Sequence, residues 1–319
     1  METTAHWDAV TLGETMAALH REPGSNLFRA TPAGAESNVA IGMAQLGCKT
    51  RWVSRVGDDD FGRLITESIG GYGVDVHVQK DDVFPTGLMV KEINAGTSRV
   101  RYYRSQSAAR HLDVSMLLDV GESTWFHLTG VTAALSANGA EIVAAIVEGR
   151  TGHNGRVSFD VNYRPILWPD LQSARDALLG IARKADLVFI GDDEAERLLG
   201  TTDVDEIAAA LLTADDQELV MKRGSGPATY ITRSHNASEP ARRVDIVDVT
   251  GAGDAFASGY LAADCWGWDP ASRLRLGHFM AARVVGSLSD LGPDIDQLEI
   301  ATLAAAQRSS LTSNRSGTK

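Results

Sequence analysis

The chain has 319 residues, of which 44% are hydrophobic, and a formal net charge of −12 at pH 7. This length and composition suit one large α/β domain with a modest appendage, whereas the negative charge argues against nucleic acid or an anionic membrane as a partner. No apolar run approaches the roughly 20 residues of a membrane-spanning helix, and residues 1–12 lack the basic start and apolar stretch of a secretion signal, so we expect a cytoplasmic protein.

Two segments in the first third of the chain, residues 15–31 and 86–105, break the pattern of the remainder. The second is predicted to form a hairpin, with strands at 88–93 and 98–104 joined by an Asn-Ala-Gly-Thr turn. Side chains alternate between the two faces of a strand, so Tyr102 and Arg104 should lie on one face. A phenol and a guanidinium could then reach the same ligand.

The middle of the chain alternates between short apolar strand candidates and helical patterns. The strands are expected at 124–129, 157–161, 186–190 and 218–222, and the helices at 137–149, 172–184 and 204–213. This alternation is typical of a parallel, doubly wound sheet, whose ligands bind beyond the carboxyl ends of the strands.

One of these strand ends carries polar side chains with a spacing of two residues. The alternation of a strand would bring Asp160, Asn162 and Arg164 together and direct Arg164 into a site. We interpret Asp160 as stabilising the strand end or orienting Arg164, and not as a catalytic residue.

The run from Asp248 to Gly259, with the sequence DVTGAGDAFASG, carries the most chemical information. Residues 243–249 alternate in a β-branched pattern and residues 254–263 are small and apolar, so the glycines are predicted to form a strand-to-helix turn. A dinucleotide fingerprint would need a third glycine where Phe256 stands. The sequence also contains no GxxxxGK[ST] phosphate loop.

This turn is suited to binding an anion. Gly251 and Gly253 can adopt backbone angles closed to other residues, which leaves the amides of Gly251, Ala252, Gly253 and Asp254 to bind one anion at the positive end of a helix. A migrating γ-phosphoryl group fits such an anion hole, and Asp254 is a candidate base for an attacking hydroxyl. The alternative is a plain glycine turn in which Asp254 is only a helix-start carboxylate.

The longer string DxTGAGDAFxxGY closely resembles the C-terminal signature of the PfkB family of carbohydrate kinases, also called the ribokinase family. Residues 33–47 (AGAESNVAIGMAQLG) are similar to its N-terminal signature, and residues 55–62 (RVGDDDFG) to a further family segment. The resemblance covers roughly residues 8–300. It implies that Asp254 is the catalytic base.

The resemblance also implies the fold and the partners. We expect one ribokinase-like α/β domain over residues 1–307, with a doubly wound, mostly parallel sheet, helices on both faces, and a small β-sheet lid from residues 15–31 and 86–105. The lid would keep water from competing with the sugar hydroxyl. ATP and Mg²⁺ are the implied cofactors, and a homo-oligomer formed through the lid or neighbouring surfaces is expected. Residues 308–319 are polar and serine-rich, which predicts a disordered tail.

Carried over residue by residue, the resemblance implies how a sugar is bound. Gly34 and Asn38 would hold its hydroxyls, and Asp290 would make a further hydroxyl contact. Tyr102 and Arg104 would close over the sugar, and Arg164 would meet an acid group at its end. The residues alone leave other roles open, since exposed arginines often make weak ion pairs and Tyr102 could simply pack within the lid.

Five motifs are similar to the 2-keto-3-deoxygluconate kinase branch of the family. They are GETM at 13–16, AGAE at 33–36, YYR at 102–104, HLTG at 127–130 and DVNYR at 160–164. That substrate is a sugar acid, and a carboxylate is the usual bidentate partner of a guanidinium. Met89 stands where this branch often has a lid tyrosine.

The function implied is transfer of the γ-phosphoryl group of Mg·ATP to the terminal (6-) hydroxyl of 2-keto-3-deoxygluconate. A fructokinase- or ribokinase-like kinase of a neutral sugar would share the whole phosphoryl site and is the alternative. A sugar-binding regulator that has lost catalysis is a further one.

On the nucleotide side, residues 221–226 (MKRGSG) resemble the family's loop along the ATP phosphates and ribose. Lys222, Gly224 and Gly226 are the implied contacts, together with Gly251 and Gly253 of the anion hole. Pro227 replaces the last glycine of this loop.

Two further residues are assigned to the nucleotide and metal by the resemblance. Glu194 is similar to the glutamate of the family's Asn-x-x-Glu motif, which acts on Mg²⁺ through water, although Gly191 replaces the asparagine. Without the family, Glu194 would be an acidic helix start. His278 stands where an adenine-side asparagine often lies, or is a histidine that packs its helix.

Overall fold

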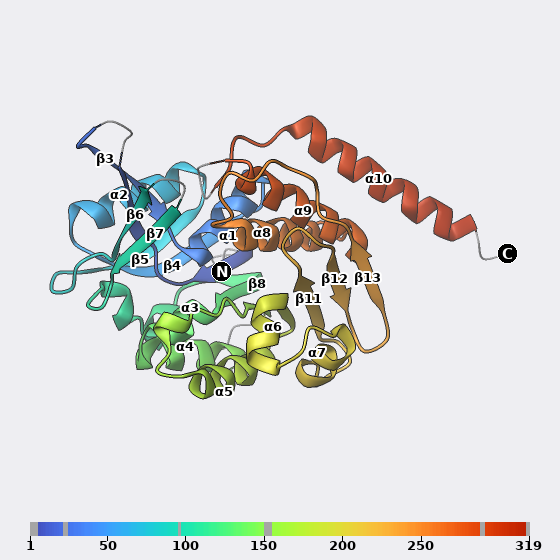
Figure 1. Ribbon diagram of the computed structural model, residues 1–319, viewed down its shortest axis with the longest axis horizontal. Coiled ribbons are helices and arrows are strands. Elements are labelled where there is room, and N and C mark those ends of the chain that lie inside the picture. The colour runs from blue at the N-terminus through green and yellow to red at the C-terminus, as the bar shows by residue number, and fades with distance from the viewer. Residues whose placement is uncertain (1–5, 22–24, 95–96, 150–154, 288–290, 317–319) are drawn as a thin grey trace, which may run out of the picture.

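The computed structural model describes residues 6–21, 25–94, 97–149, 155–287 and 291–316. In this part of the chain it contains two sheets, a nine-stranded one in the order β13-β12-β11-β10-β9-β8-β1-β4-β5 and a four-stranded one in the order β3-β2-β6-β7. Figure 1 shows the helices around the larger sheet and the small sheet at one end of the molecule.

The strands of the larger sheet are β1 (His6–Leu12), β4 (Thr50–Gly57), β5 (Asp75–Asp81), β8 (Glu122–Thr129), β9 (Arg156–Asp160), β10 (Leu187–Gly191), β11 (Glu218–Lys222), β12 (Ala228–Ile231) and β13 (Asn236–Glu239). Those of the smaller sheet are β2 (Met16–Arg21), β3 (Phe28–Ala33), β6 (Leu88–Asn94) and β7 (Thr97–Tyr103). The α-helices are α1 (Ala35–Gln45), α2 (Asp60–Gly71), α3 (Gly130–Leu135), α4 (Ala137–Val147), α5 (Leu171–Ala182), α6 (Asp192–Leu199), α7 (Val204–Leu211), α8 (Ala252–Cys265), α9 (Pro270–Val285) and α10 (Gln297–Ser316). Short 3₁₀ turns are η1 (Ala108–His111), η2 (Val114–Leu117) and η3 (Pro165–Leu167).

The larger sheet is doubly wound, as predicted. In sheet order, the strands β5, β4, β1, β8, β9, β10 and β11 run parallel to their neighbours. Strands β12 and β13 add an antiparallel edge. The chain builds β4 and β5 on one side of β1 and then continues with β8 on the other side. Such a reversal of strand order opens a crevice beyond the carboxyl ends of the strands, where ligands bind. These ends include Thr129, Asp160, Gly191 and Lys222.

Each face of this sheet buries its own apolar side chains, because successive residues of a strand point to opposite faces. Val188 and Ile190 of β10 pack in a core with α4, α5, α6 and α7. Leu187 and Phe189 of the same strand pack in a second core with α1, α8 and α9 on the other face. Helices therefore cover both faces, and the strands need to be apolar on both sides.

Helices α8 and α9 pack at very short range, which brings the start of α8 firmly into the second layer. A Cβ atom on Gly259 of α8 would lie 2.6 Å from the carbonyl oxygen of Leu276 in α9. Only a glycine permits this approach of two backbones.

The four-stranded sheet is the predicted lid. β2 pairs with β3 in antiparallel and with β6 in parallel fashion, and β6 and β7 form the predicted antiparallel hairpin. In this hairpin Met89 lies opposite Tyr102. The lid is therefore built from chain segments far apart in sequence.

One expectation about local structure is wrong. Residues 243–249 form no strand; the amides of Val247 and Asp248 donate instead to the carbonyl of Val285 at the end of α9, at 2.9 and 3.2 Å. Ile246 is 69% exposed, so its β-branched side chain faces solvent and not a sheet interior. Residues 308–316 lie within α10, and the expected disorder of the tail stays a prediction.

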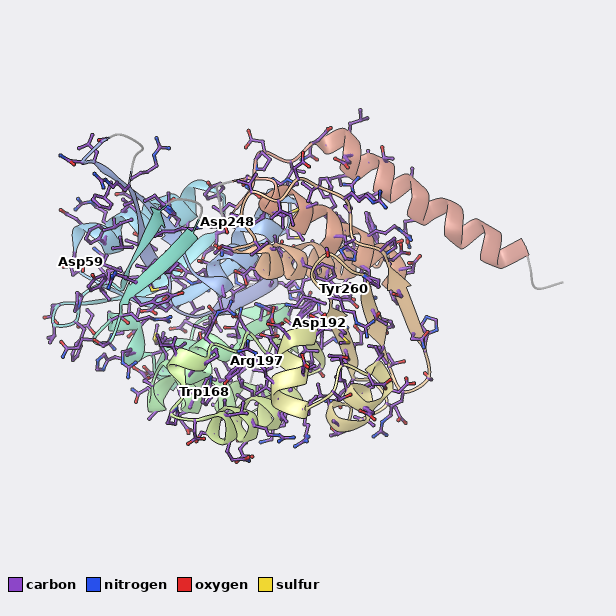
Figure 2. The ribbon with its side chains drawn as sticks, viewed as in Figure 1. Asp59, Trp168, Asp192, Arg197, Asp248 and Tyr260 are labelled. Carbon is purple, nitrogen blue, oxygen red and sulfur yellow. The ribbon has the colours of Figure 1, made fainter. Side chains whose placement is uncertain are left out.

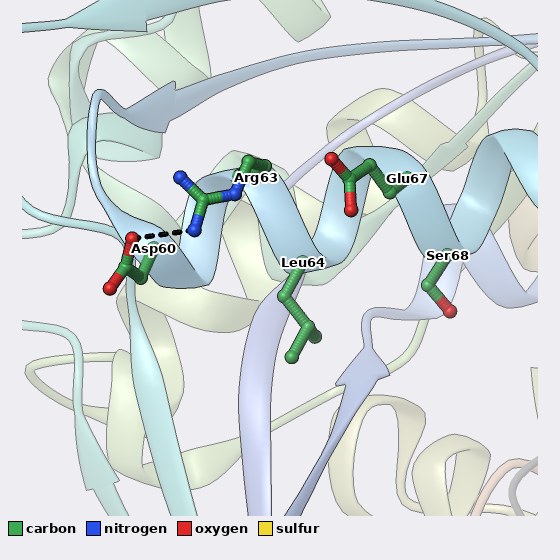
Figure 3. A pocket seen from close by; sticks show the side chains of 5 residues that line it. All are labelled: Asp60, Arg63, Leu64, Glu67 and Ser68. Carbon is green, nitrogen blue, oxygen red and sulfur yellow. Dashed lines mark hydrogen bonds and ion pairs between the residues drawn. The ribbon is translucent and has the colours of Figure 1, made fainter.

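A surface hollow of about 600 Å³ lies on α2, lined by Asp60, Arg63, Leu64, Glu67 and Ser68 (Figure 3). Asp60 and Arg63 bridge one turn of this helix at 2.8 Å. None of these residues was predicted to bind a ligand. Among the described residues no helix is both long and apolar enough to cross a membrane.

The contact between α8 and α9 predicts the effect of one added methyl group. Gly259→Ala should destabilise the protein by about 1–3 kcal/mol, because the backbones of two packed helices must separate. The matched change Gly180→Ala in α5, where nothing lies within 4 Å of the new atom, should instead stabilise it by about 0.5–1 kcal/mol. Urea unfolding of both variants measures the difference. Equal midpoints would show that α8 and α9 separate without cost.

Candidate active site

Charged side chains gather where the parallel strands end. Asp160 is the last residue of β9 and Lys222 the last of β11, and Glu194 lies in the first turn of α6, which follows β10. Asp254 reaches the same place from the first turn of α8. The parallel sheet brings the strand ends to one edge, so residues 160, 194 and 222 converge although they are far apart in sequence.

Asp254 is held by an amide and is poorly solvated. The Nδ2 atom of Asn38 donates to Asp254 Oδ2 at 2.9 Å. Burial raises the pKa of Asp254 to about 7, helped by the charge of Asp160 and opposed by Asn38, Arg164 and Lys222. Desolvation disfavours a charged carboxylate. A carboxylate with this pKa exchanges its proton near neutral pH, as a general base must.

The glycine turn before α8 has the predicted special backbone conformation at Gly251, whereas Gly253 lies within the helix. Gly251 caps the helix with a φ of 78°, in the left-handed region that favours glycine. Gly253 and Asp254 lie in the first helical turn, where amides have no acceptor within the helix. The amide of Ala252 already donates to the carbonyl of Val249 at 3.3 Å, so it is not a fully free member of the predicted anion hole.

Lys222 adds a largely buried positive charge beside this turn, with its side chain 17% exposed. Its Nζ lies 2.6 Å from Asp160 Oδ2, and a Cβ atom on Gly253 would lie 3.4 Å from the same nitrogen. Burial alone would lower the pKa of Lys222, but the carboxylates of Asp160 and Glu194 outweigh it and raise the pKa. The ammonium therefore stays charged and faces the start of α8. Asp160, expected to orient Arg164, pairs with Lys222 instead.

Glu194 is fixed by backbone amides. Its Oε1 accepts from Tyr163 N at 2.7 Å and its Oε2 from Gly191 N at 2.8 Å. Burial raises the pKa of Glu194, as does the neighbouring Asp160, while Lys222 lowers it. The helix-start role is real, since Glu194 bonds back to the residue that caps α6. It also lies close enough to the other charges to be part of the site.

Arg164 reaches the site by a different path from the predicted one. β9 ends at Asp160, and Asn162 has a φ of 39°, so the strand alternation does not continue to Arg164. The side chain of Arg164 is exposed, and its Nη1 lies 3.4 Å from the carbonyl of Tyr163. Its charge nevertheless acts on Asp254. Arg164 is thus a solvent-accessible cation near the candidate base.

Arg104 is largely buried and already has a partner. It forms an ion pair with Glu14, and the two side chains are 11% and 1% exposed. Its charge also acts on Glu36, which is fully buried, and burial raises the pKa of that carboxyl despite hydrogen bonds from Thr132 and Thr129. Tyr102 is 44% exposed, with its ring 6.0 Å from the Arg104 guanidinium. The sequence did not predict that the charge of Arg104 is neutralised by Glu14.

Gly34 lies beneath the lid for a packing reason. It caps α1, and a Cβ atom there would lie 2.4 Å from the carbonyl oxygen of Glu14. The absent side chain lets α1 start directly against the β1–β2 connection, which brings Asn38 within reach of Asp254. Gly34 therefore shapes the site whether or not its backbone touches a ligand.

The residues expected on the nucleotide side are less gathered. Gly224 and Gly226 lie in the turn between β11 and β12, where the Gly226 amide donates to Arg223 O at 2.6 Å. His278 is 7% exposed, and its Nε2 lies 3.3 Å from Ala228 N and 3.0 Å from Glu239 O. These contacts match the packing alternative for His278. Asp290 lies outside the described residues.

The donor set fits a metal held mainly by a ligand and water. No group of three or more His, Cys, Asp and Glu side chains suitable for a metal occurs in the described part of the chain. Asp160 Oδ1 is buried and has no hydrogen-bond partner there. An oxygen acceptor is thus left for a metal-bound water, and Mg²⁺ commonly keeps several waters and takes few carboxylates.

Comparison with known proteins agrees with this arrangement. The family model described as pfkB family carbohydrate kinase matches residues 8–295. A 2-dehydro-3-deoxygluconokinase from Bacillus subtilis (strain 168) is 33% identical over 312 residues, covering 94% of this chain and 96% of the relative. A second from Thermoproteus tenax is 36% identical over 296 residues, covering 88% and 89%.

A solved structure confirms the ribokinase-like fold predicted from the sequence. The fructokinase with bound ATP from Xylella fastidiosa has a TM-score of 0.83 and is 24% identical, and the match covers 94% of this chain and 99% of that one.

The raised pKa of Asp254 predicts a pH-dependent stability. The folded protein keeps this proton between about pH 4 and 7 whereas the unfolded chain loses it, so stability falls as the pH rises through this range. Asp254→Asn removes this titrating carboxyl. The free energy of unfolding of the variant, relative to that of wild type, should therefore rise by about 2 kcal/mol between pH 4 and pH 8, a value already reduced for solvent screening. Urea unfolding at both pH values measures this gain. The exposed Asp245→Asn is the control, and an equal gain in both variants would contradict the assignment.

Proposed function

The chain belongs to the pfkB family of carbohydrate kinases, which makes it a phosphotransferase with an alcohol acceptor, and we propose that it phosphorylates 2-keto-3-deoxygluconate, also called 2-dehydro-3-deoxygluconate. The γ-phosphoryl group of ATP would pass to the terminal (6-) hydroxyl of this sugar acid. The observation that carries the proposal is the pairing of a half-buried base, Asp254, with a helix start and a largely buried lysine, Lys222.

The proton transfer follows from the environment of Asp254. The sugar hydroxyl loses its proton to the Asp254 carboxylate as its oxygen bonds to the γ-phosphorus, and the bond from phosphorus to the leaving ADP oxygen breaks. Asn38 orients the carboxylate through its 2.9 Å hydrogen bond. With the pKa of Asp254 at about 7, the base is partly ionised at neutral pH and largely ionised at mildly alkaline pH.

The charge of the migrating group would meet the start of α8 and Lys222. The amides of Gly251, Gly253 and Asp254 and the Lys222 ammonium form a fixed positive environment, which needs no reorganisation during the reaction. A Mg²⁺ ion on the ATP oxygens would neutralise further charge. Glu194, and Asp160 through its unpartnered oxygen, would hold waters of that ion.

The choice of a sugar acid is supported by Arg164 and by the names of two relatives. Arg164 is exposed, its charge acts on Asp254, and its Nη1 makes only a long contact, at 3.4 Å, with the Tyr163 carbonyl. A guanidinium in this state can take a carboxylate in bidentate fashion. The relatives from Bacillus subtilis and Thermoproteus tenax are both named for 2-dehydro-3-deoxygluconate.

We also propose that the enzyme is a homo-oligomer and is located in the cytoplasm.

One observation favours the neutral-sugar alternative. Arg104, expected as the second carboxylate-binding arginine, is paired with Glu14 and lies near Glu36. A guanidinium that is already neutralised binds a further carboxylate weakly. A kinase of a neutral sugar would need neither arginine, so substrate comparison decides between the two.

Asp254→Asn should lower kcat by about 10²–10⁴-fold, because the amide cannot take the proton. KM for both substrates should change by less than about threefold, since the isosteric amide keeps the shape of the site. Steady-state ADP release measures both constants. Turnover equal to wild type would refute the role of Asp254 as base.

Substrate preference tests the acid. ADP release with Mg·ATP should be strong with 2-keto-3-deoxygluconate and weak with gluconate, fructose and ribose at the same concentration. Arg164→Ala should reduce kcat/KM for the acid by about 10–100-fold, the loss expected for a charged hydrogen-bonded pair, with KM for ATP little changed. Preference for fructose or ribose, or equal losses for neutral and acidic sugars, would overturn the carboxylate role.

A further inference from the structure

A buried lysine of the lid contacts the turn that precedes α8. Lys91 lies on β6, and its Nζ forms an ion pair with Asp248 Oδ2, although the two residues are 157 positions apart. Figure 2 shows Asp248 between the lid strands and the helix layer. The side chain of Lys91 is 5% exposed and that of Asp248 is 20% exposed. The contact is therefore a tertiary link between the lid and the catalytic turn.

Burying this ion pair costs free energy, so its main effect is to specify a geometry and not to add stability. Removing a lysine ammonium from water is unfavourable, and a buried ion pair often adds little net stability. Breaking such a pair from one side, by contrast, leaves a buried charge without compensation. The pair therefore strongly favours one relative position of β6 and Asp248, and penalises others.

The second oxygen of Asp248 extends the link into the turn. Asp248 Oδ1 accepts hydrogen bonds from Thr250 N at 3.0 Å and Thr250 Oγ1 at 2.8 Å. Thr250 directly precedes Gly251, the left-handed cap of α8. One carboxylate thus joins the lid lysine to the backbone that positions the start of α8, while the Asp248 amide is anchored on Val285 of α9.

The same lid strand is joined to the residues expected over the sugar. β6 pairs with β7, in which Tyr102 lies opposite Met89 and Val100 opposite Lys91. A shift of this hairpin against the main sheet would therefore move Lys91 and Tyr102 together.

We propose that Lys91 is a positioning residue whose ion pair with Asp248 couples the position of the lid relative to the main sheet to the geometry of the anion-binding turn. The catalytic part of this inference rests on the proposed function. With the lid seated, the pair holds residues 248–251 in place for phosphoryl transfer. When the pair is lost, sugar and ATP still bind, but the turn is less well ordered.

The first test is independent of activity. Hydrogen–deuterium exchange of peptides covering residues 246–256 should be faster by about tenfold in Lys91→Met than in wild type, because local opening of this turn becomes easier. Lys80→Met is the matched control, since Lys80 forms an exposed ion pair with Asp58 at 3.0 Å and should leave these peptides unchanged. Unchanged exchange in Lys91→Met would overturn the inference, whatever the protein phosphorylates.

Kinetics of the same variants test the catalytic consequence. Lys91→Met should lower kcat by about 10–100-fold, as expected for a small misplacement of reacting groups, with both KM values changed less than about threefold. Lys91→Arg should restore most of the rate. Lys91→Met/Asp248→Asn should cost no more than Lys91→Met, because the two residues act as one unit. A wild-type kcat in Lys91→Met would refute the positioning role, whereas a wild type that phosphorylates no sugar would refute the proposed function.

The double variant also guards against misfolding, because it leaves no buried charge unpaired. If Lys91→Met fails to fold, Lys91→Met/Asp248→Asn replaces it in both measurements. Slower turnover and faster exchange in residues 246–256 support the inference, and wild-type values of both overturn it.

Discussion

The candidate site depends on the sharing of one buried ammonium among several carboxylates. Lys222 pairs with Asp160, and its charge also acts on Glu194 and Asp254. Around Asp254 the negative charge of Asp160 is opposed by the positive charges of Arg164 and Lys222, so it is burial, the largest cause, that keeps the pKa of Asp254 raised. The basicity of Asp254 is therefore set by burial and by the cluster as a whole. The same ammonium faces Gly253, so the group that tunes the base also adds to the anion-binding surface.

The parallel sheet is what makes this cluster possible. β9, β10 and β11 are neighbours in register, with Phe189 opposite Asp160 and Gly191 opposite Lys222. Three successive strand ends thus deliver three charged groups to one edge without any local sequence relation between them. Apolar helices on both faces hold these strands in place, and the close packing of α8 on α9 brings the glycine turn to the same edge from one side.

Features of the chain that depend on local pattern could be predicted from the sequence. The apolar strands, the helices between them, the lid hairpin and the left-handed Gly251 follow from periodicity or from a glycine at a defined place. Features set by distant partners could not. Residues 243–249 have a strand-like composition, but their amides bond to the end of α9. At Asn162 a single left-handed residue redirects the chain and invalidates an extrapolated alternation.

The charged pairs illustrate the same limit. Glu14 and Arg104 belong to motifs that were noticed, but only the fold places them together in the interior. Lys91 and Asp248 carry no sequence signal for each other at all. In contrast, Asp254 and Lys222 were identified because each stands in a short motif that is itself tied to phosphate binding. Functional residues that belong to one short motif can be identified from the sequence. Ion pairs between residues that are far apart in the sequence can be identified only from the structure.

The two arginines of the candidate sugar site differ in what they can do, and burial is the reason. Arg104 is neutralised by Glu14, so a substrate carboxylate brought against it would meet a cation that is already paired. Its remaining N–H groups suit neutral hydroxyls better. Arg164 is exposed, and its long hydrogen bond to the Tyr163 carbonyl, at 3.4 Å, engages Nη1 alone, which leaves other N–H groups at the edge of the guanidinium to a carboxylate. Within the proposed function, acid recognition therefore falls to Arg164, and Arg104 serves to position the lid over the sugar.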